Sequence, residues 1–268
     1  MKKINTRKTP VYRDSGFYLE NADRTGRAFD AEKEHPWEPE FYIYSRYRNP
    51  TVVSAELKIG QLEEAGWALL TQSGMAAIDV AISLFQTAGD RRNWLFFSDI
   101  YGGTNSFIDH VLTSRRAISV HRFSSHRDRY DLAELDKLFN SLRPALLYFE
   151  IVSNPMLIIA DLKGIIRLAK KYGCMVIIDN TFATPQLVRP LTMGADMVIH
   201  SVTKYLAGHG NITAGVICGH DKELLKQAIE YRKWVGHMLS PDDAARLEDQ
   251  LKTFEVRFEK QCSNAAYL

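Results

Sequence analysis

The sequence predicts an α/β fold in which a mostly parallel sheet is covered by helices on both faces. Two observations support this prediction. Short apolar runs of strand length alternate along the chain with segments of helical periodicity, which is typical of repeated strand–helix units. In addition, polar side chains that can carry chemistry follow the ends of several apolar runs, which is where functional residues gather in such folds.

The predicted strands are short and apolar, and several contain no polar residue at all. Continuous apolar runs are typical of strands that are buried on both faces of a sheet. In chain order, the predicted strands cover residues 67–70, 94–97, 117–123, 145–151, 175–178, 197–200 and 212–218.

Helices are predicted between these strands, where apolar residues recur with a period near that of the α-helix. Asp131 stands in the N-cap position of one of them, since its side chain can accept hydrogen bonds from the first amides of a helix. The predicted helices cover residues 74–86, 105–112, 132–139, 162–172 and 221–236, and a long charged helix follows Pro241.

The composition is that of an ordinary globular protein, with 46% hydrophobic and 25% charged residues among 268. A formal net charge of +2 gives no electrostatic bias toward nucleic acid or an anionic membrane. No apolar run approaches the length of a membrane span, and the polar first residues lack the apolar core of a signal peptide. Three widely spaced cysteines argue against a disulfide framework. We therefore expect a cytoplasmic protein without nucleic-acid or membrane partners.

Lys204 and Asp179 are the strongest candidates for catalytic chemistry. Lys204 lies in the segment Ser-Val-Thr-Lys-Tyr, directly after an apolar run and before a glycine-rich turn, and Asp179 ends the apolar run 175–178. A lysine and a carboxylate at neighbouring strand ends are the two groups that pyridoxal phosphate requires. The amine binds this cofactor as a Schiff base, and the carboxylate keeps the pyridine nitrogen protonated. We therefore predict pyridoxal 5'-phosphate as the cofactor and no metal ion.

These residues belong to a longer pattern that resembles the Cys/Met-metabolism family of pyridoxal-phosphate enzymes. The resemblance implies the large domain of a fold type I pyridoxal-phosphate transferase, similar to that of aspartate aminotransferase. It also implies an enzyme of the kind represented by cystathionine γ-synthase, cystathionine lyases and O-acetylhomoserine sulfhydrylase. The pattern consists, in the family's order, of Tyr44-Ser45-Arg46, Asn49-Pro50-Thr51, Ser73-Gly74-Met75-Ala76-Ala77, Asp99-Ile100-Tyr101-Gly102-Gly103-Thr104, Asp179-Asn180-Thr181-Phe182-Ala183-Thr184-Pro185, Gly194-Ala195-Asp196 and His200-Ser201-Val202-Thr203-Lys204-Tyr205.

The resemblance also implies how the phosphate of the cofactor is held. Ser73, Gly74 and Met75 open a predicted helix, so their amides and the helix dipole would face an anion. From the local pattern alone, Ser73 is more simply an N-cap. The two hydroxyl residues that flank the lysine, Ser201 and Thr203, occupy alternate positions, would share a strand face and can donate hydrogen bonds to the same phosphate.

Tyr101 and Asn154 are assigned to the cofactor ring by the resemblance. Tyr101 resembles the tyrosine that stacks on the ring and accepts a proton from the substrate amine, so we predict that it is catalytic together with Lys204. Asn154 resembles the asparagine that hydrogen-bonds the phenolic oxygen of the ring. From the residues alone, the two are an aromatic residue beside a glycine turn and an asparagine in a turn before proline.

We expect an N-terminal extended arm (residues 1–55), a cofactor-binding domain (56–240) and the start of an incomplete C-terminal domain (241–268). The arm is rich in charges and prolines and shows little periodicity. The resemblance implies that Tyr44 and Arg46 in the arm complete the phosphate site of a neighbouring subunit in a homodimer or homotetramer. Family members continue into a small domain with a carboxylate-binding arginine, for which we find no candidate, so we expect that domain to be largely absent.

Three classes of function are compatible with the sequence. The first is a pyridoxal-phosphate-dependent lyase or transferase of transsulfuration, in cysteine metabolism or methionine biosynthesis. It would act by γ-replacement or by β- or γ-elimination on a sulfur amino acid or a homoserine ester. The second is a catalytically inactive cofactor-binding fragment or regulatory protein of the same fold. The third is a purely structural α/β module, which the intact lysine, aspartate and phosphate-binding residues disfavour. Neither the substrate nor the choice between elimination and replacement follows from the sequence.

Overall fold

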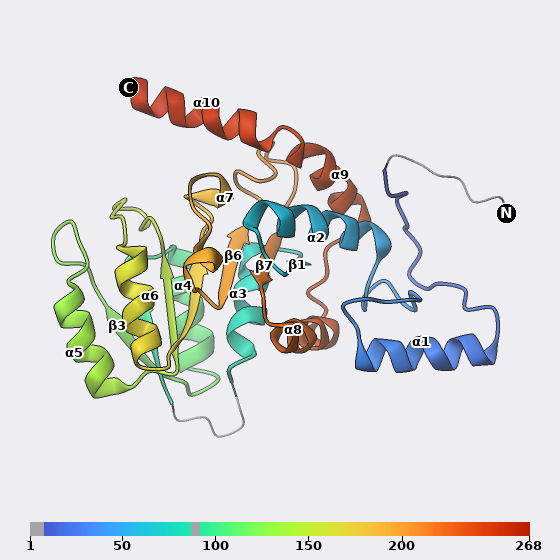
Figure 1. Cartoon of the computed structure of the whole chain (residues 1–268), viewed down its shortest axis with the longest axis horizontal. Helices are drawn as coiled ribbons and strands as arrows, with labels where there is room; N and C mark the ends of the chain where they lie inside the picture. The colour runs from blue at the N-terminus through green and yellow to red at the C-terminus, as the bar shows by residue number, and fades with distance from the viewer. Residues whose placement is uncertain (1–7, 87–91) are drawn as a thin grey trace.

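The computed structural model describes residues 8–86 and 92–268, in which seven strands form one sheet in the order β1-β7-β6-β5-β4-β2-β3 (Figure 1). The pairs β2–β3, β2–β4, β4–β5 and β5–β6 are parallel, whereas β7 is antiparallel to both of its neighbours, β6 and β1. The predicted fold class, with a mostly parallel sheet, is therefore confirmed. The strands are β1 Trp67–Thr71, β2 Asn93–Phe97, β3 Ser119–Phe123, β4 Leu146–Glu150, β5 Met175–Asp179, β6 Met197–Ser201 and β7 Gly215–Gly219.

Helices flank this sheet. They are α1 Ala22–Glu34, α2 Pro50–Glu63, α3 Gly74–Ser83, α4 Gly102–Phe107, the π-helical η1 Ile108–Thr113, α5 Leu132–Leu142, α6 Leu162–Lys171, α7 Thr184–Leu187, the 3₁₀-helical η2 Pro190–Met193, α8 Lys222–Val235, α9 Pro241–Leu251 and α10 Phe254–Tyr267. Helix α3 packs on β6, β7 and β1 and contacts α4 and α8, and α8 also packs on β1. On the other side of the chain, α5 and α6 pack together and α6 lies on β5 (Figure 1). No helix among residues 8–86 and 92–268 combines the length and the apolar character needed to cross a membrane.

The core explains the continuous apolar runs of the sequence. Every residue of β4 is buried, and the large side chains of Trp94, Phe96, Tyr148 and Phe149 have no exposed surface. A strand with helices on both faces has no side that faces solvent, so both sets of alternating side chains are apolar. Each such side chain contributes about 1.5–3 kcal/mol when it is fully buried.

Three predicted elements differ in detail from the structure. The helix expected over 105–112 is split into α4 and η1, and the long helix expected after Pro241 is split into α9 and α10. The second break lies at Thr253, whose backbone leaves the helical region (φ −112°, ψ 6°). The strand expected from residue 212 begins only at Gly215, because the backbone N–H and C=O of Ala214 bond to Thr203 instead of entering the ladder.

The segment 1–55, which we expected to be an extended arm, contains the 13-residue helix α1. Asn21 starts this helix, since its side chain accepts a hydrogen bond from the Arg24 N–H at 2.9 Å. The helix carries few apolar residues and buries little of its surface, which is why the sequence shows no periodicity there. Residues 1–7 of the predicted arm lie outside the described part of the chain.

A buried ionic cluster around Glu56 joins the N-terminal segment to the sheet. The Glu56 carboxylate lies 2.9 Å from Arg48 Nη1 and 3.0 Å from Arg232 Nη1 of α8. It also accepts the Leu70 N–H of β1 at 2.9 Å, and Arg232 donates to Leu70 O at 2.7 Å. Burial lowers the pKa of Arg232 to about 10 despite the charge of Glu56. The cluster therefore holds α2, β1 and α8 together at the edge of the sheet, where β1 pairs with β7.

Candidate active site

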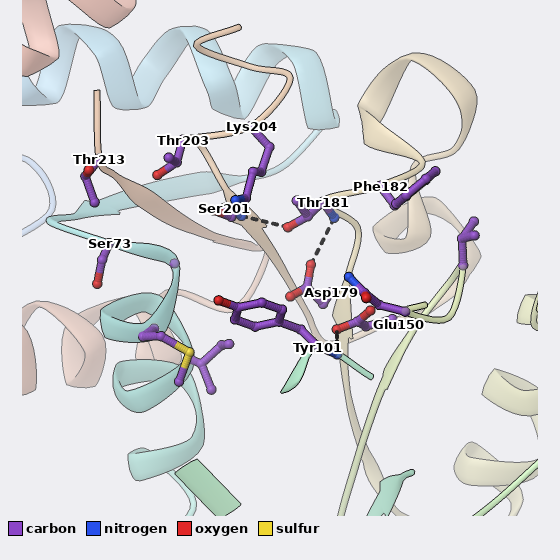
Figure 2. A pocket seen from close by; sticks show the side chains of 15 residues that line it. Ser73, Tyr101, Glu150, Asp179, Thr181, Phe182, Ser201, Thr203, Lys204 and Thr213 are labelled. Atoms are coloured by element: carbon purple, nitrogen blue, oxygen red, sulfur yellow. Dashed lines mark hydrogen bonds between the residues drawn. The ribbon is translucent and has the colours of Figure 1, made fainter. Parts of the chain in front are cut away.

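A cavity of about 220 Å³ opens at the carboxyl ends of the parallel strands (Figure 2). Every residue that we predicted to bind the cofactor lines it, except Tyr44 and Arg46. The structure therefore brings together residues from five different segments of the chain, and their individual roles stay predictions. They are Ser73, Gly74, Met75, Tyr101, Asn154, Asp179, Ser201, Thr203 and Lys204.

Lys204 lies in the loop of residues 202–214, which connects β6 to β7. Its N–H donates to Ser201 O at 3.1 Å, and its carbonyl accepts the Gly208 N–H at 2.8 Å. These bonds close a turn around Lys204, from which the side chain enters the cavity toward the ends of β5 and β6 (Figure 2). The amine therefore shares the cavity with the carboxylate of Asp179.

Asp179 is the last residue of β5, and hydrogen bonds orient both of its carboxylate oxygens. Oδ1 accepts the Thr181 N–H at 2.9 Å, and Oδ2 accepts the Tyr148 hydroxyl at 3.1 Å. Burial, together with the charge of Asp179, raises the pKa of the Tyr148 phenol well above its ordinary value, so Tyr148 stays a donor. The Thr181 hydroxyl accepts the Ser201 N–H at 2.7 Å and so ties the end of β5 to the end of β6 (Figure 2).

Glu150 is a candidate residue that sequence reasoning missed. It ends β4 in register with Asp179, is 8% exposed, and accepts the Tyr101 N–H at 2.7 Å. Burial, and then the charge of Asp179, raise the pKa of Glu150 to about 8. At neutral pH Glu150 is therefore mostly protonated. The available signal was that a carboxylate lies at or next to the last residue of two successive predicted strands, 145–151 and 175–178.

Thr181 and Phe182 were also missed as site residues, although both line the cavity from the turn after Asp179. The rule that functional residues follow strand ends would have included them. Asp196, in contrast, lies outside the cavity, where it accepts the Val176 N–H at 2.7 Å and pairs with Lys170. Its contacts are those of a structural residue.

The start of α3 forms one wall of the cavity. Ser73 caps this helix, since its hydroxyl accepts the Ala76 N–H at 3.0 Å. A Cβ on Gly215 of β7 would lie 2.2 Å from Ser73 O, and a Cβ on Gly74 would lie 3.0 Å from Ser201 Cβ. The absence of these side chains lets the helix start approach β6 and β7 closely. Its first amides, which have no acceptor within a helix, can therefore bind an anion at this wall.

Thr203 and Tyr101 differ in how readily they can contact a ligand. The Thr203 hydroxyl donates to Ala214 O at 3.1 Å and accepts the Ala214 N–H at 3.0 Å. It would have to release Ala214 O before it could donate to a phosphate. Tyr101 is 48% exposed, and its ring extends across the cavity from the end of β2 toward Ser73 (Figure 2). Its ring is therefore accessible to a ligand.

Tyr44 and Arg46 lie away from the cavity of their own chain. Arg46 Nη1 donates to Lys233 O of α8. Its guanidinium carbon lies 5.3 Å from the ring centroid of Tyr44 and 5.4 Å from that of Tyr47. Within one chain the structure does not bring this pair to the site, and its role in a neighbouring subunit stays a prediction.

The chemical groups that line the cavity, and their positions in it, fit pyridoxal phosphate. Lys204 supplies an amine, Asp179 an oriented carboxylate whose neighbour Glu150 is protonated, and α3 an anion-binding helix start. The three groups come from different elements and line one space. Among residues 8–86 and 92–268, no group of three or more His, Cys, Asp or Glu side chains is arranged to hold a metal ion.

Comparisons with known sequences agree with this geometry. The model of the Cys/Met metabolism PLP-dependent enzyme family matches residues 1–268. L-methionine gamma-lyase of Fusobacterium nucleatum subsp. polymorphum is 38% identical over 261 residues, which are 96% of this chain and 62% of that protein. Cystathionine beta-lyase of Lactococcus lactis subsp. cremoris (strain MG1363) is 37% identical over 230 residues, which are 85% of this chain and 58% of that protein. The chain thus spans about three fifths of the length of these curated relatives.

Solved structures show the same arrangement. Cystathionine gamma synthase from Xanthomonas oryzae pv. oryzae, in complex with cystathionine, matches with a TM-score of 0.80 and 28% identity, over 93% of this chain and 59% of that chain. A Campylobacter jejuni protein assigned as an O-acetylhomoserine (thiol)-lyase matches with a TM-score of 0.84 and 28% identity, over 98% of this chain and 70% of that chain. Its structure contains N'-pyridoxyl-lysine-5'-monophosphate.

We predict that Glu150 makes the stability of the cofactor-free protein fall as the pH rises toward 8. The pKa of Glu150 is about 8 in the folded chain and about 4.3 in an unfolded chain. Between these values the folded state binds one more proton, so each pH unit should lower the free energy of unfolding by at most about 1.4 kcal/mol.

Unfolding free energies of the wild type and Glu150→Gln, measured from about pH 5 to about pH 8, test this prediction. Glutamine keeps an oxygen acceptor for the Tyr101 N–H but does not titrate. The wild type should therefore lose stability relative to Glu150→Gln as the pH rises. Parallel curves for the two proteins would contradict the raised pKa.

Proposed function

Because the chain belongs to the Cys/Met metabolism family of PLP-dependent enzymes, we propose that it acts as a pyridoxal-phosphate-dependent lyase or transferase. The proposed reaction is γ-replacement or β- or γ-elimination on a sulfur amino acid or a homoserine ester, of the class of cystathionine, methionine or O-acetylhomoserine. The observation that carries this proposal is that Lys204 and Asp179 line one cavity. Asp179 is the last residue of β5, and Lys204 follows the end of the adjacent parallel strand β6. The relatives' names support this reaction class.

Asp179 holds a proton on the pyridine nitrogen in this proposal. When bound, pyridoxal phosphate supplies a protonated ring that accepts the electron pair of a broken substrate bond. Thr181 and Tyr148 fix the direction of the Asp179 carboxylate. Because burial raises the pKa of Glu150 to about 8, we assign the contact with the ring nitrogen to Asp179.

Lys204 binds the cofactor covalently and, once a substrate amine has displaced it, transfers protons between substrate carbons. Tyr101 accepts a proton from the substrate amine; it is accessible in the cavity, and its backbone is held by Glu150. The start of α3 and Ser201 would hold the phosphate, with Thr203 as a further donor, and Asn154 would contact the phenolic oxygen of the ring. These assignments use side chains that line the same cavity.

The proposal includes a homodimer or homotetramer in which Tyr44 and Arg46 reach the phosphate site of a neighbouring subunit. It is supported by their distance from their own cavity and by the partial exposure of Tyr44. We also propose the division into an arm (1–55), a cofactor-binding domain (56–240) and the beginning of a further domain (241–268). We also propose a role in methionine biosynthesis and a cytoplasmic location. The location is supported by three unpaired cysteines, which fit a reducing compartment.

Labelling and turnover together test the proposed function. With pyridoxal phosphate bound, borohydride should fix the cofactor to the peptide that contains Lys204. Elimination from cystathionine or O-acetylhomoserine should release a keto acid, whereas replacement on O-acetylhomoserine by an added thiol should form a thioether and release acetate. Lys204→Ala should lose the label and reduce turnover by a factor of about a hundred or more, whereas Lys163→Ala, an exposed lysine of α6, should change neither.

A label on another lysine would contradict the assignment of Lys204. A labelled Lys204 with neither release of a keto acid nor formation of a thioether would favour the alternative of a cofactor-binding protein without catalysis.

Asp179→Asn should retain the cofactor on Lys204 but lose most of the activity, because a neutral amide cannot keep the ring nitrogen protonated. Removing one partner of a buried ion pair costs about 3–5 kcal/mol, so we expect the turnover number to fall well beyond tenfold. Glu150→Gln is the matched control, since it makes the same chemical change in a carboxyl group that is protonated near neutral pH. Equal losses in the two variants would refute the special role of Asp179.

Hybrid oligomers test the role of Arg46. A chain with Lys204→Ala is mixed with a chain with Arg46→Ala, and the affinity for pyridoxal phosphate is measured at the intact lysine. If the phosphate site is shared, the Lys204→Ala chain contributes its intact Arg46 to the site that contains Lys204 of the other chain. That one site of each hybrid dimer should then bind pyridoxal phosphate tightly again. Arg143→Ala, an exposed arginine that follows α5, replaces Arg46→Ala as the control. Hybrids that bind as weakly as the Arg46→Ala parent would mean that each chain builds its phosphate site alone.

A further inference from the structure

Arg257 on α10 contacts the loop of residues 202–214 that carries Lys204. Its Nη1 donates to Tyr205 O at 3.0 Å, and its Nη2 donates to Leu206 O at 3.1 Å. These are the two carbonyls that follow Lys204 along the chain. The two bonds use the planar fork of the guanidinium, which an ammonium group does not reproduce. Arg257 thus binds the backbone immediately beside the proposed cofactor lysine.

The remaining donors of Arg257 anchor it to the turn between α9 and α10. Nη2 also donates to Gln250 O, and Nε donates to Thr253 Oγ1, both at 3.1 Å. All four acceptors are uncharged oxygens, and three of them are backbone carbonyls. The side chain therefore bridges the turn between the two helices and the loop, and its geometry is specified by four acceptors at once.

Gly208 makes room for this guanidinium. Its φ of +72° lies in the left-handed region that glycine adopts readily, and a Cβ there would lie 1.7 Å from Arg257 Nη1. The Gly208 N–H donates to Lys204 O at 2.8 Å. The same glycine therefore closes the turn around Lys204 on one side and packs against Arg257 on the other.

Two further contacts join α9 and α10 to the loop and the cavity. Arg246 of α9 donates to Asn211 O at 2.9 Å, near the far end of the loop. The ring of Tyr205 lies between Phe258 of α10 and Phe182, with centroid distances of 5.2 Å and 6.1 Å. Since Phe182 lines the cavity, α10 contacts the site through side chains as well as through the loop backbone. Figure 1 shows α10 following α9 along this edge of the molecule.

We propose that Arg257 is a positioning residue, which fixes the turn that directs the Lys204 amine into the cavity by binding the two carbonyls after Lys204. The inference rests on the proposed function only for the role of that amine, because the contact itself belongs to the folded chain. Without the guanidinium the two carbonyls bond to water and the turn opens more often. The amine then spends less time in the orientation that reaction requires.

Hydrogen exchange of the full chain, with pyridoxal phosphate and again after its removal, tests this contact. In Arg257→Lys the amides of Ala207 and Gly208, which donate to carbonyls inside the loop, should exchange about tenfold faster or more. The strand amides of β4 and β5 should change by less than about twofold. Lys260→Ala removes an exposed charge from the same helix and should leave both loop amides as in the wild type.

Gly208→Ala is a second test that leaves Arg257 in the chain. The added Cβ displaces the guanidinium, so this change should also accelerate exchange of the Ala207 amide selectively. Because both changes act on one contact, the effect of Gly208→Ala should be smaller in the Arg257→Lys background than alone. If Arg257→Lys does not fold, Thr253→Val, which removes the acceptor of Arg257 Nε, replaces it in this comparison. Equal acceleration in the loop and in β4 and β5, or no acceleration at all, would overturn the proposal.

The rate at which borohydride-fixable cofactor accumulates on Lys204 measures the consequence for the amine. This rate should fall about tenfold or more in Arg257→Lys and stay unchanged in Lys260→Ala. A wild-type chain that is not labelled at Lys204 would contradict the proposed function. Normal labelling of the wild type with an unchanged rate in Arg257→Lys would instead overturn the positioning role, so the two failures are distinct.

Discussion

The parallel register of β4, β5 and β6 is the constraint on which the site depends. It pairs Glu150 with Asp179 and Asp179 with Ile199, so the turns after these strands meet at one edge of the sheet. Hydrogen bonds from the Ser201 N–H to the Thr181 hydroxyl and from the Thr181 N–H to Asp179 extend this alignment beyond the strands. A slip of one residue would turn the carboxyl groups to the opposite face of the sheet.

The register also places two carboxyl groups side by side, where they cannot both be charged without a large cost. The two carboxyl groups differ in hydrogen bonding and in burial. Asp179 accepts two hydrogen bonds from Thr181 and Tyr148 and is less buried, whereas Glu150 is almost fully buried beside it. Asp179 thus offers an oriented carboxyl group to the cavity, and Glu150 holds the backbone of Tyr101.

Much of the fold and of the candidate site could be predicted because the residues concerned follow local rules. The buried strands are continuous apolar runs, and Lys204 and Asp179 stand directly after such runs. Ser73 caps a helix whose start the sequence marks. Helix α1 was missed because its few buried residues produce no apolar period. The break between α9 and α10 was missed because Thr253 is neither glycine nor proline, the residues that most often end a helix. Glu150 was missed because its environment depends on a neighbouring strand.

The sequence by itself determined the alternation of strands and helices, the amine and the carboxylate of the site, and the resemblance to a cofactor-dependent family. Only the tertiary structure decided that antiparallel β7 lies between β1 and β6, that Gly215 lets Ser73 approach, and that Arg257 packs over Gly208. These contacts join residues that are far apart along the chain. They depend on which strands and helices become neighbours. The two-residue period of a strand and the 3.6-residue period of a helix indicate which face of an element is buried, but not which element it packs against.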